Sequence, residues 1–411
     1  MNSRRDLLAA GGAASILGLG PSFASSRAIR ELLQQGAPAS TTGDEFLLSS
    51  GLIYLNTAST GPTSRAVLER TLEAWTELET NPVAQAYGNE GVLAWTDQVR
   101  EKAAALLGCS VDEILVTRST SEGMNTVAQG LRLNAGDRVL TTDQEHTGGS
   151  DCWRYLAARR GILVDTVALP PDEHDPAAIV QRLTSAMRPE TKVLSVSHVL
   201  WTTGLCMPIA ELAKHARERG ILCVVDGAQA AGCVPVDVKA LGCHAYATTG
   251  HKWVLGPKGT GVLYVSADAA DAIQPIQWMG GKRVTSASTG IGPLPIVVGL
   301  GAAIDALQAR GLASIEAHNG ALRERAYQGL KTIPKLRVLS PESGPLATPL
   351  VSVALPAEID STAVFDALLH EHSIQVKKIL HPFNGLRISP HRFNTEADID
   401  AALAALRAEL V

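Results

Sequence analysis

One lysine and one acid near the middle of the chain have the types and the spacing to support covalent catalysis. Asp226 directly follows the apolar run Ile221–Val225, and Lys252 comes shortly after a second run, His244–Thr248. Short, β-branched or aromatic runs of this kind are typical of strands in a sheet that is covered on both faces. Because ligands collect at the carboxyl ends of such strands, both side chains are expected to face one pocket.

A lysine amine beside a carboxylate is one way to hold pyridoxal phosphate (PLP). The amine can form a Schiff base with the aldehyde of this cofactor. An acid against the pyridine nitrogen keeps that nitrogen protonated, so the ring can accept electrons. For Lys252 taken alone, the plainer interpretation is a surface lysine beside a capping acid.

Two motifs around these residues resemble a known family. D-G-A-Q at Asp226–Gln229 and T-G-H-K-W-x-x-G-P at Thr249–Pro257 resemble the class V PLP-dependent aminotransferases. The resemblance is greatest to the branch that contains the cysteine desulfurases and the isopenicillin-N-epimerase-like proteins, and it covers roughly residues 50–410. It implies the fold-type-I architecture, an aldimine on Lys252 and a homodimer.

The same resemblance assigns roles to the residues around the lysine. Asp226 is expected to pair with the pyridine nitrogen and Gln229 with the phenolic oxygen, while Thr249 or His251 reaches the phosphate. Burial among the strands is expected to lower the pKa of Lys252 from its ordinary value near ~10.4, because desolvation disfavours the ammonium form.

Hydroxyl residues follow the strand predicted at Ile114–Thr117 and open a helix. The backbone N–H groups of a helix start form an anion site suited to phosphate, and the family's phosphate loop occupies this place in the chain order. Thr120 and Ser121 are therefore the predicted phosphate ligands. Taken alone, the same residues would read as an ordinary N-cap.

His146, in the pair Glu145-His146, matches the family histidine whose imidazole lies flat on the pyridine ring. A lone histidine at a strand end is otherwise a capping or core residue. The resemblance also places a threonine of a later loop on the phosphate of the neighbouring subunit. Thr289 is the candidate, although the surrounding motif matches imperfectly.

Two residues are predicted to bind the substrate. Asn56, in the loop after Tyr54-Leu55, matches a family asparagine that faces the substrate, and a turn asparagine is the alternative. Arg387, in R-I-S-P-H, matches the arginine that clamps the substrate carboxylate, for which a planar guanidinium is suited. The alternative for Arg387 is a solvated strand arginine.

The chain also departs from the desulfurases. Leu200 and Trp201 stand where those enzymes carry asparagines, and no cysteine follows Cys243, so sulfur transfer through a persulfide is not expected. The resemblance implies amino-acid transamination because this reaction is frequent in the family, while the residues themselves do not choose between it and the alternatives, which are epimerisation, β-elimination and a catalytically silent binding protein. A nucleotide-binding Rossmann protein is not favoured, because no G-x-G-x-x-G turn follows an early strand.

The predicted elements alternate between strands and helices, which favours an α/β fold with a largely parallel sheet in a large domain. A smaller α+β domain follows, joined by a long helix from Pro295 through Lys331. Its predicted strands include Ser373–Lys377. The seven strands expected in the large sheet are Ile114–Thr117, Arg138–Thr142, Ile162–Val167, Lys192–Ser197, Ile221–Val225, His244–Thr248 and Thr260–Val265.

The N-terminus resembles a twin-arginine (Tat) export signal. Ser3-Arg4-Arg5-Asp6-Leu7-Leu8 precedes a short apolar stretch and a small-residue cleavage site. Export to the periplasm by the Tat machinery is therefore predicted. The expected segments are residues 1–24 as signal peptide, 25–48 as lead-in, 49–300 as large domain, and 301–411 as linker helix and small domain.

Composition excludes other classes. Of the 411 residues, 45% are hydrophobic and 19% charged, with a net charge of −5 and no block of like charge, which argues against nucleic-acid binding. After the N-terminal signal, no apolar run is long enough to span a membrane. The family resemblance implies a small amino-acid-type substrate as the partner. The six cysteines lack metal-ligand spacing. Export would permit disulfides, but their apolar settings favour buried thiols.

Overall fold

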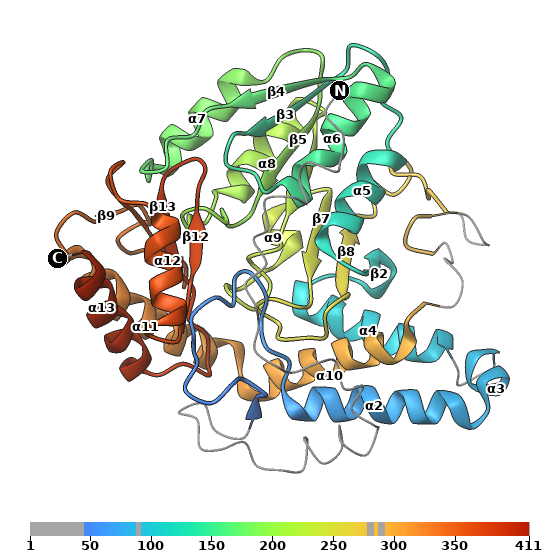
Figure 1. Cartoon of the computed structure of the whole chain (residues 1–411). Helices are drawn as coiled ribbons and strands as arrows, with labels where there is room; N and C mark the ends of the chain where they lie inside the picture. Colours follow the sequence, from blue (N-terminus) through green and yellow to red (C-terminus); the bar gives the residue numbers. More distant parts are fainter. Residues whose placement is uncertain (1–44, 88–91, 278–282, 287–291, 411) are drawn as a thin grey trace. The chain divides into compact units, whose positions relative to one another are not determined.

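The computed structural model describes residues 45–87, 92–277, 283–286 and 292–410 (Figure 1). The predicted signal peptide and most of the lead-in lie outside these residues. The largest sheet has seven strands in the order β2-β8-β7-β6-β5-β3-β4, and only β8 runs antiparallel to its neighbours. This confirms the predicted mostly parallel sheet. Its strands are β2 Ile114–Thr117, β3 Arg138–Thr142, β4 Leu163–Val167, β5 Thr191–Ser197, β6 Leu222–Asp226, β7 Ala245–Thr249 and β8 Gly261–Val265.

Both faces of this sheet are buried, which explains the continuous apolar runs in the sequence. In β6, Cys223 and Val225 pack into one hydrophobic cluster, whereas Val224 packs into the cluster on the opposite face. Successive side chains of a strand point to opposite faces, so a strand covered on both sides must be apolar throughout. Helices α5 (Thr120–Gly130) and α6 (Thr147–Arg160) supply residues to the cluster around Val224, and α8 (Ile209–Glu218) supplies residues to the other.

Polar side chains cap the starts of two helices of this part. The side chain of Ser119 accepts a hydrogen bond from the Glu122 amide and His146 accepts one from the Gly148 amide, so α5 and α6 begin at their caps. The helices are α2 Arg65–Thr80, α3 Pro82–Tyr87, α4 Val92–Leu107, α5 Thr120–Gly130, α6 Thr147–Arg160, α7 Pro176–Ala186, α8 Ile209–Glu218 and α9 Val238–Leu241, with a 3₁₀ turn at Val111–Glu113.

The C-terminal part contains a four-stranded sheet in the order β12-β13-β10-β9, with helices α11, α12 and α13 beside it (Figure 1). A strand from the start of the chain, β1, pairs with β11 of this part. These elements are β1 Ile53–Tyr54, β9 Arg337–Val338, β10 Val351–Ala354, β11 Ile374–Gln375, β12 Lys377–Ile379, β13 Gly385–Ile388, α10 Leu294–Arg310, α11 Leu312–Lys331, α12 Ser361–His370 and α13 Glu396–Leu410.

Two predictions for this part are wrong in detail. The strand expected at Ser373–Lys377 is two strands, because the chain changes partners at Val376, from β1 to β13. Ile374 and Val376 are both buried, so the apolar pattern continues across the change and cannot reveal it. The single long helix is also broken, since Gly311 has a φ of +83° and turns the chain by 79° between α10 and α11.

Taken singly, the helices of the described ranges are too short or too polar to cross a membrane. The bent pair of α10 and α11 meets the criterion by joint length and composition only.

All six cysteines have free thiols, and four of them, Cys152, Cys223, Cys233 and Cys243, are buried.

Candidate active site

A cavity of about 260 Å³ opens at the carboxyl ends of β6 and β7. It lies where the strand-end motifs were predicted to converge. Ser59, Ser197 and Trp201 form part of its wall. Eight of the predicted cofactor residues also line it: Thr120, Ser121, His146, Asp226, Gln229, Thr249, His251 and Lys252.

Asp226 and Lys252 provide opposite charges in this cavity. Asp226 ends β6, and its carboxylate Oδ1 accepts a hydrogen bond of 2.9 Å from the Ala228 amide. Burial raises the pKa of Asp226, while that amide and the charge of Lys252 oppose the rise. Burial lowers the pKa of Lys252 to about 8; the charge of Asp226 opposes this shift and that of Arg387 adds to it. Lys252 is therefore more often a neutral nucleophile near pH 7 than an exposed lysine would be.

The residues around this pair fit PLP. Thr120 Oγ1 is buried and has no hydrogen-bond partner in the described chain, so it can serve a phosphate at the start of α5. Thr249 Oγ1 lies 2.7 Å from Nδ1 of His251 on the same wall. A Cβ added to Gly149 would lie 2.1 Å from Asp226 Oδ2, so α6 packs directly on the carboxylate. The amine, the acid and the free hydroxyl match the groups that this cofactor needs.

His146 lies in the wall and has two contacts. Its Nδ1 accepts the Gly148 amide at 3.0 Å, as the N-cap of α6, and its ring meets the ring of Trp201 edge-on at 5.4 Å. Desolvation lowers the pKa of His146 to about 4, and the charges of Lys252 and Arg387 contribute. The ring is therefore neutral at physiological pH and can lie against an aromatic cofactor without a charge.

Gln229 is held by two neighbours. Its Nε2 donates to the Ala58 carbonyl at 2.8 Å, and Trp253 Nε1 donates to its Oε1 at 2.9 Å. Because the amide nitrogen has two hydrogens, one donor remains for a group in the cavity. This agrees with the predicted contact to a phenolic oxygen.

Arg387 lies beyond the part of the wall that Ser59 and Trp201 form, and it is 1% exposed. Its Nη1 donates to the Trp201 carbonyl at 2.6 Å, and Nη2 donates to Ser59 Oγ at 3.1 Å and to Asn56 Oδ1 at 3.4 Å. Thus the two predicted substrate residues are in contact. Arg387 Nε is buried with no partner in the part of the chain described. Burial lowers the pKa of Arg387 to about 9.

The two sheets are joined at the site by backbone contacts. Asn56 forms a bridge with Ser389, just after Arg387. The Gly61 amide donates to the His251 carbonyl at 2.8 Å, beside Lys252. These contacts fix the loop that carries Asn56 against the segments of both Lys252 and Arg387.

Glu145 contacts Ser197 of the cavity wall, and the sequence did not single it out. Ser197 Oγ donates to its Oε2 at 2.5 Å, and Thr142 Oγ1 donates to its Oε1 at 2.7 Å. Burial raises the pKa of Glu145 to about 7, and the nearby charge of Asp226 adds to the rise. The position of Glu145, between the end of β3 and His146, was the one sequence feature that could have identified it. Thr289, the predicted intersubunit ligand, lies outside the described residues.

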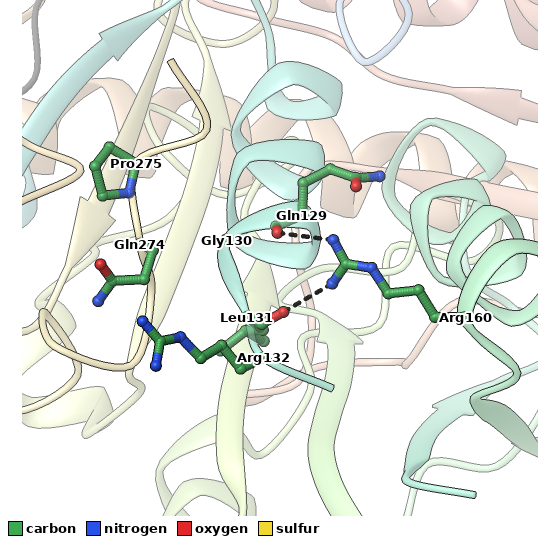
Figure 2. Close-up of a pocket in the computed structure, with 7 residues that line it drawn as sticks. All are labelled: Gln129, Gly130, Leu131, Arg132, Arg160, Gln274 and Pro275. Carbon is green, nitrogen blue, oxygen red and sulfur yellow. Dashed lines mark hydrogen bonds between the residues drawn. The ribbon is translucent and has the colours of Figure 1, made fainter. Parts of the chain in front are cut away.

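A separate pocket of about 390 Å³ lies at the C-terminal end of α5 (Figure 2). Arg160 donates there to the carbonyls of Leu131 at 2.9 Å and Gln129 at 3.3 Å. These bonds satisfy carbonyls that the helix end leaves free, which is a structural role. The pocket contains none of the predicted site residues.

Similarity to known proteins supports the reading of the cavity. The family model for class V aminotransferases matches residues 53–402. The isopenicillin N epimerase of Streptomyces clavuligerus is 32% identical over 384 residues, which cover 88% of this chain and 96% of that protein. A probable cysteine desulfurase of Methanothermobacter thermautotrophicus is 33% identical over 299 residues, covering 68% of this chain and 73% of the relative.

A solved structure extends the similarity to the fold. A mutant of C-DES with glycine covalently linked to the PLP cofactor superimposes with a TM-score of 0.78 at 27% identity, covering 87% of this chain and 96% of that one. The family match, the fold and a cavity that joins Lys252 to Asp226 agree. The chain therefore belongs to the class V aminotransferase family of PLP-dependent enzymes.

Proposed function

We propose that this protein is a PLP-dependent enzyme that acts at the Cα of an amino acid with a free α-carboxylate, and that it catalyses transamination. One observation carries the proposal: Lys252 and Asp226 line one cavity, and the buried cation Arg387 lies just behind its wall. A binding protein would not need a buried lysine amine of low pKa beside an acid.

Each residue has a distinct task in this proposal. Arg387 binds the α-carboxylate, which supplies the anion that its buried guanidinium lacks. Lys252 takes the proton from Cα, because a base with a pKa of about 8 suits proton transfer near neutral pH. The bound cofactor supplies an electron sink for the Cα electron pair. Asp226 stabilises the protonated pyridine nitrogen.

The state of His146 favours transamination over an epimerisation that uses two proton-transfer groups. Epimerisation by two groups needs a proton donor on the face of Cα opposite the base. With a pKa of about 4, His146 is neutral at neutral pH, and the single N–H of a neutral imidazole is a much weaker acid than an imidazolium. Among the histidine and lysine side chains that line the cavity, Lys252 is then the one best suited to move protons. Epimerisation remains the second candidate, because the similarity to isopenicillin N epimerase extends over 88% of the chain.

The reaction can be identified by following one amino acid at a time in D₂O with the PLP-loaded protein. Transamination predicts a keto acid that accumulates when a second keto acid is supplied as acceptor. Deuterium at Cα with inversion and no keto acid would instead identify an epimerase. Ammonia release from β-substituted substrates would identify a lyase, and no reaction with any amino acid would indicate a silent binding protein.

Export and dimerisation are further parts of the proposal. Arg4 and Arg5 precede the apolar stretch of a Tat-type signal, so the folded, cofactor-loaded protein is expected to reach the periplasm. Replacing both arginines with lysine should retain the protein in the cytoplasm, and periplasmic recovery of that variant would contradict this route. Sedimentation of the mature chain should show a homodimer.

A further inference from the structure

A second cation lies beside the substrate arginine. In the antiparallel pair β12–β13, Lys377 is directly opposite Arg387. Residues in this relation point to the same face of a sheet, with their Cβ atoms about 5 Å apart. Arg387 points to the cavity wall, since it binds the Trp201 carbonyl and Ser59. Lys377 therefore projects on the side of the substrate site.

No acid balances these two cations among the residues that the structure describes. Within the described ranges, no ion pair joins a carboxylate to Arg387 or Lys377, although Arg387 is buried and Lys377 is half-buried. Burial lowers the pKa of Lys377, and the charges of Arg387 and Lys378 lower it further. The charge of Lys377 also contributes to the low pKa of His146, so it acts on the cavity. Like charges directly opposite each other in a sheet are destabilising unless an anion offsets them.

Two negative groups in the substrate would be needed to offset the charges of Arg387 and Lys377. Before the cofactor binds, the charges of Asp226 and Lys252 offset each other in the part of the cavity that would hold it. In the other half, one α-carboxylate neutralises Arg387 and leaves Lys377 without a counter-ion. Trp201 Nε1, on the same wall, is buried without an acceptor in the described chain and offers a neutral donor nearby.

We propose that the site selects amino acids with a second acidic group, with Arg387 binding the α-carboxylate and Lys377 the distal one. This inference rests on the proposed function, because it assumes that Arg387 receives the α-carboxylate. It names the substrate class of that site: amino dicarboxylates rather than neutral amino acids.

The test compares acidic amino acids with their neutral counterparts on the PLP-loaded protein. Dissociation constants for aspartate, glutamate and 2-aminoadipate, and for asparagine, glutamine and norvaline, are measured from the change in the visible cofactor band and by calorimetry. The wild type should bind the acidic set about 10- to 100-fold more tightly, which is the range for one charged hydrogen bond. K377M should remove this preference and leave the neutral set within about twofold.

Two variants serve as controls. Lys378 lies over the Phe365 ring and is opposite Leu386 rather than Arg387, so K378M should keep the preference. K377R should also keep it, because it retains the charge. Equal affinity for both sets in the wild type, or an equal loss of both in K377M, would overturn this proposal while leaving the proposed function intact. No response to any amino acid would overturn both.

Discussion

The cofactor half and the substrate half of the cavity are built in different ways. The cofactor half comes from the ends of strands in one sheet: Asp226 ends β6, Thr249 ends β7, and Thr120 opens the helix after β2. The substrate half joins Asn56 to Arg387, which are 331 positions apart in the chain. One half is fixed by sheet geometry, and the other by the docking of two distant segments.

The two halves also differ in charge. Asp226 and Lys252 oppose each other's pKa shifts across the cofactor half. Arg387 and Lys377 are both cations, and the pKa of each is lowered. Neither has an acid partner in the described ranges. In the protein alone, the charges of the cofactor half thus offset each other, whereas the cations of the substrate half are offset only when an anion binds. Variants in the two halves should therefore fail in different ways.

The largest effect is expected for Lys252. K252A should lose the covalent cofactor link, and activity should fall by about 10³-fold or more, since both the nucleophile and the base are removed. K252R is the matched control for charge, because arginine retains the cation but forms no Schiff base. Borohydride treatment followed by mass spectrometry should label Lys252 in the wild type and neither variant. Labelling of a different lysine would contradict the assignment.

A smaller and separable effect is expected for Arg387. R387A should lower kcat/KM by about 100-fold, because truncating one partner of a buried charged pair costs about 2–5 kcal/mol. The visible cofactor band should remain, since Asp226 and Lys252 are unchanged. R387K should recover only part of the loss, because lysine keeps the charge but not the two-pronged geometry. If R387A lost the cofactor as well, the two halves would not be independent.

The sequence predicted the cofactor half better than the substrate half for a physical reason. The carboxyl ends of adjacent parallel strands share one edge of a sheet, so the positions of Asp226 and Lys252 follow once the strands are recognised. No such rule relates Asn56 to Arg387, and only the family resemblance suggested that they act together. Their direct contact, and the place of Lys377 opposite Arg387, required the observed register.

Two further features could not be predicted from the sequence pattern: the bend at Gly311 and the position of His146. A glycine within a helix costs only about 1 kcal/mol relative to alanine, so Gly311 did not reveal that the chain bends there. The sequence offered a helix cap and a place flat on the cofactor ring as alternatives for His146. The structure shows that His146 caps α6 and also lines the cavity, so capping does not remove it from the site.

The pH dependence of cofactor loading tests the lowered pKa of Lys252 in the cofactor half of the cavity. Only the neutral amine attacks an aldehyde, so the rate at which apoprotein takes up PLP should rise as pH increases and the ammonium form is lost. With a pKa of about 8, the rise should be about tenfold per pH unit below pH 8 and should level off above it. Stopped-flow absorbance gives the rate. A rise that continued toward pH ~10.4 would show an unperturbed lysine.

The smallest of these effects is expected where α6 packs on Asp226. In G149A the added methyl would lie 2.1 Å from Oδ2, so the carboxylate or the helix must shift. Overpacking of this kind costs about 1–3 kcal/mol, and PLP affinity should fall by about tenfold. The KM for the amino acid at saturating PLP should stay within about twofold, because Arg387 is untouched. G320A is the matched control, because Gly320 lies on an open face of α11 with no atom within 4 Å of the new methyl. This variant should change neither the PLP affinity nor the KM for the amino acid. A raised KM with unchanged PLP affinity would show that Gly149 serves the substrate half instead.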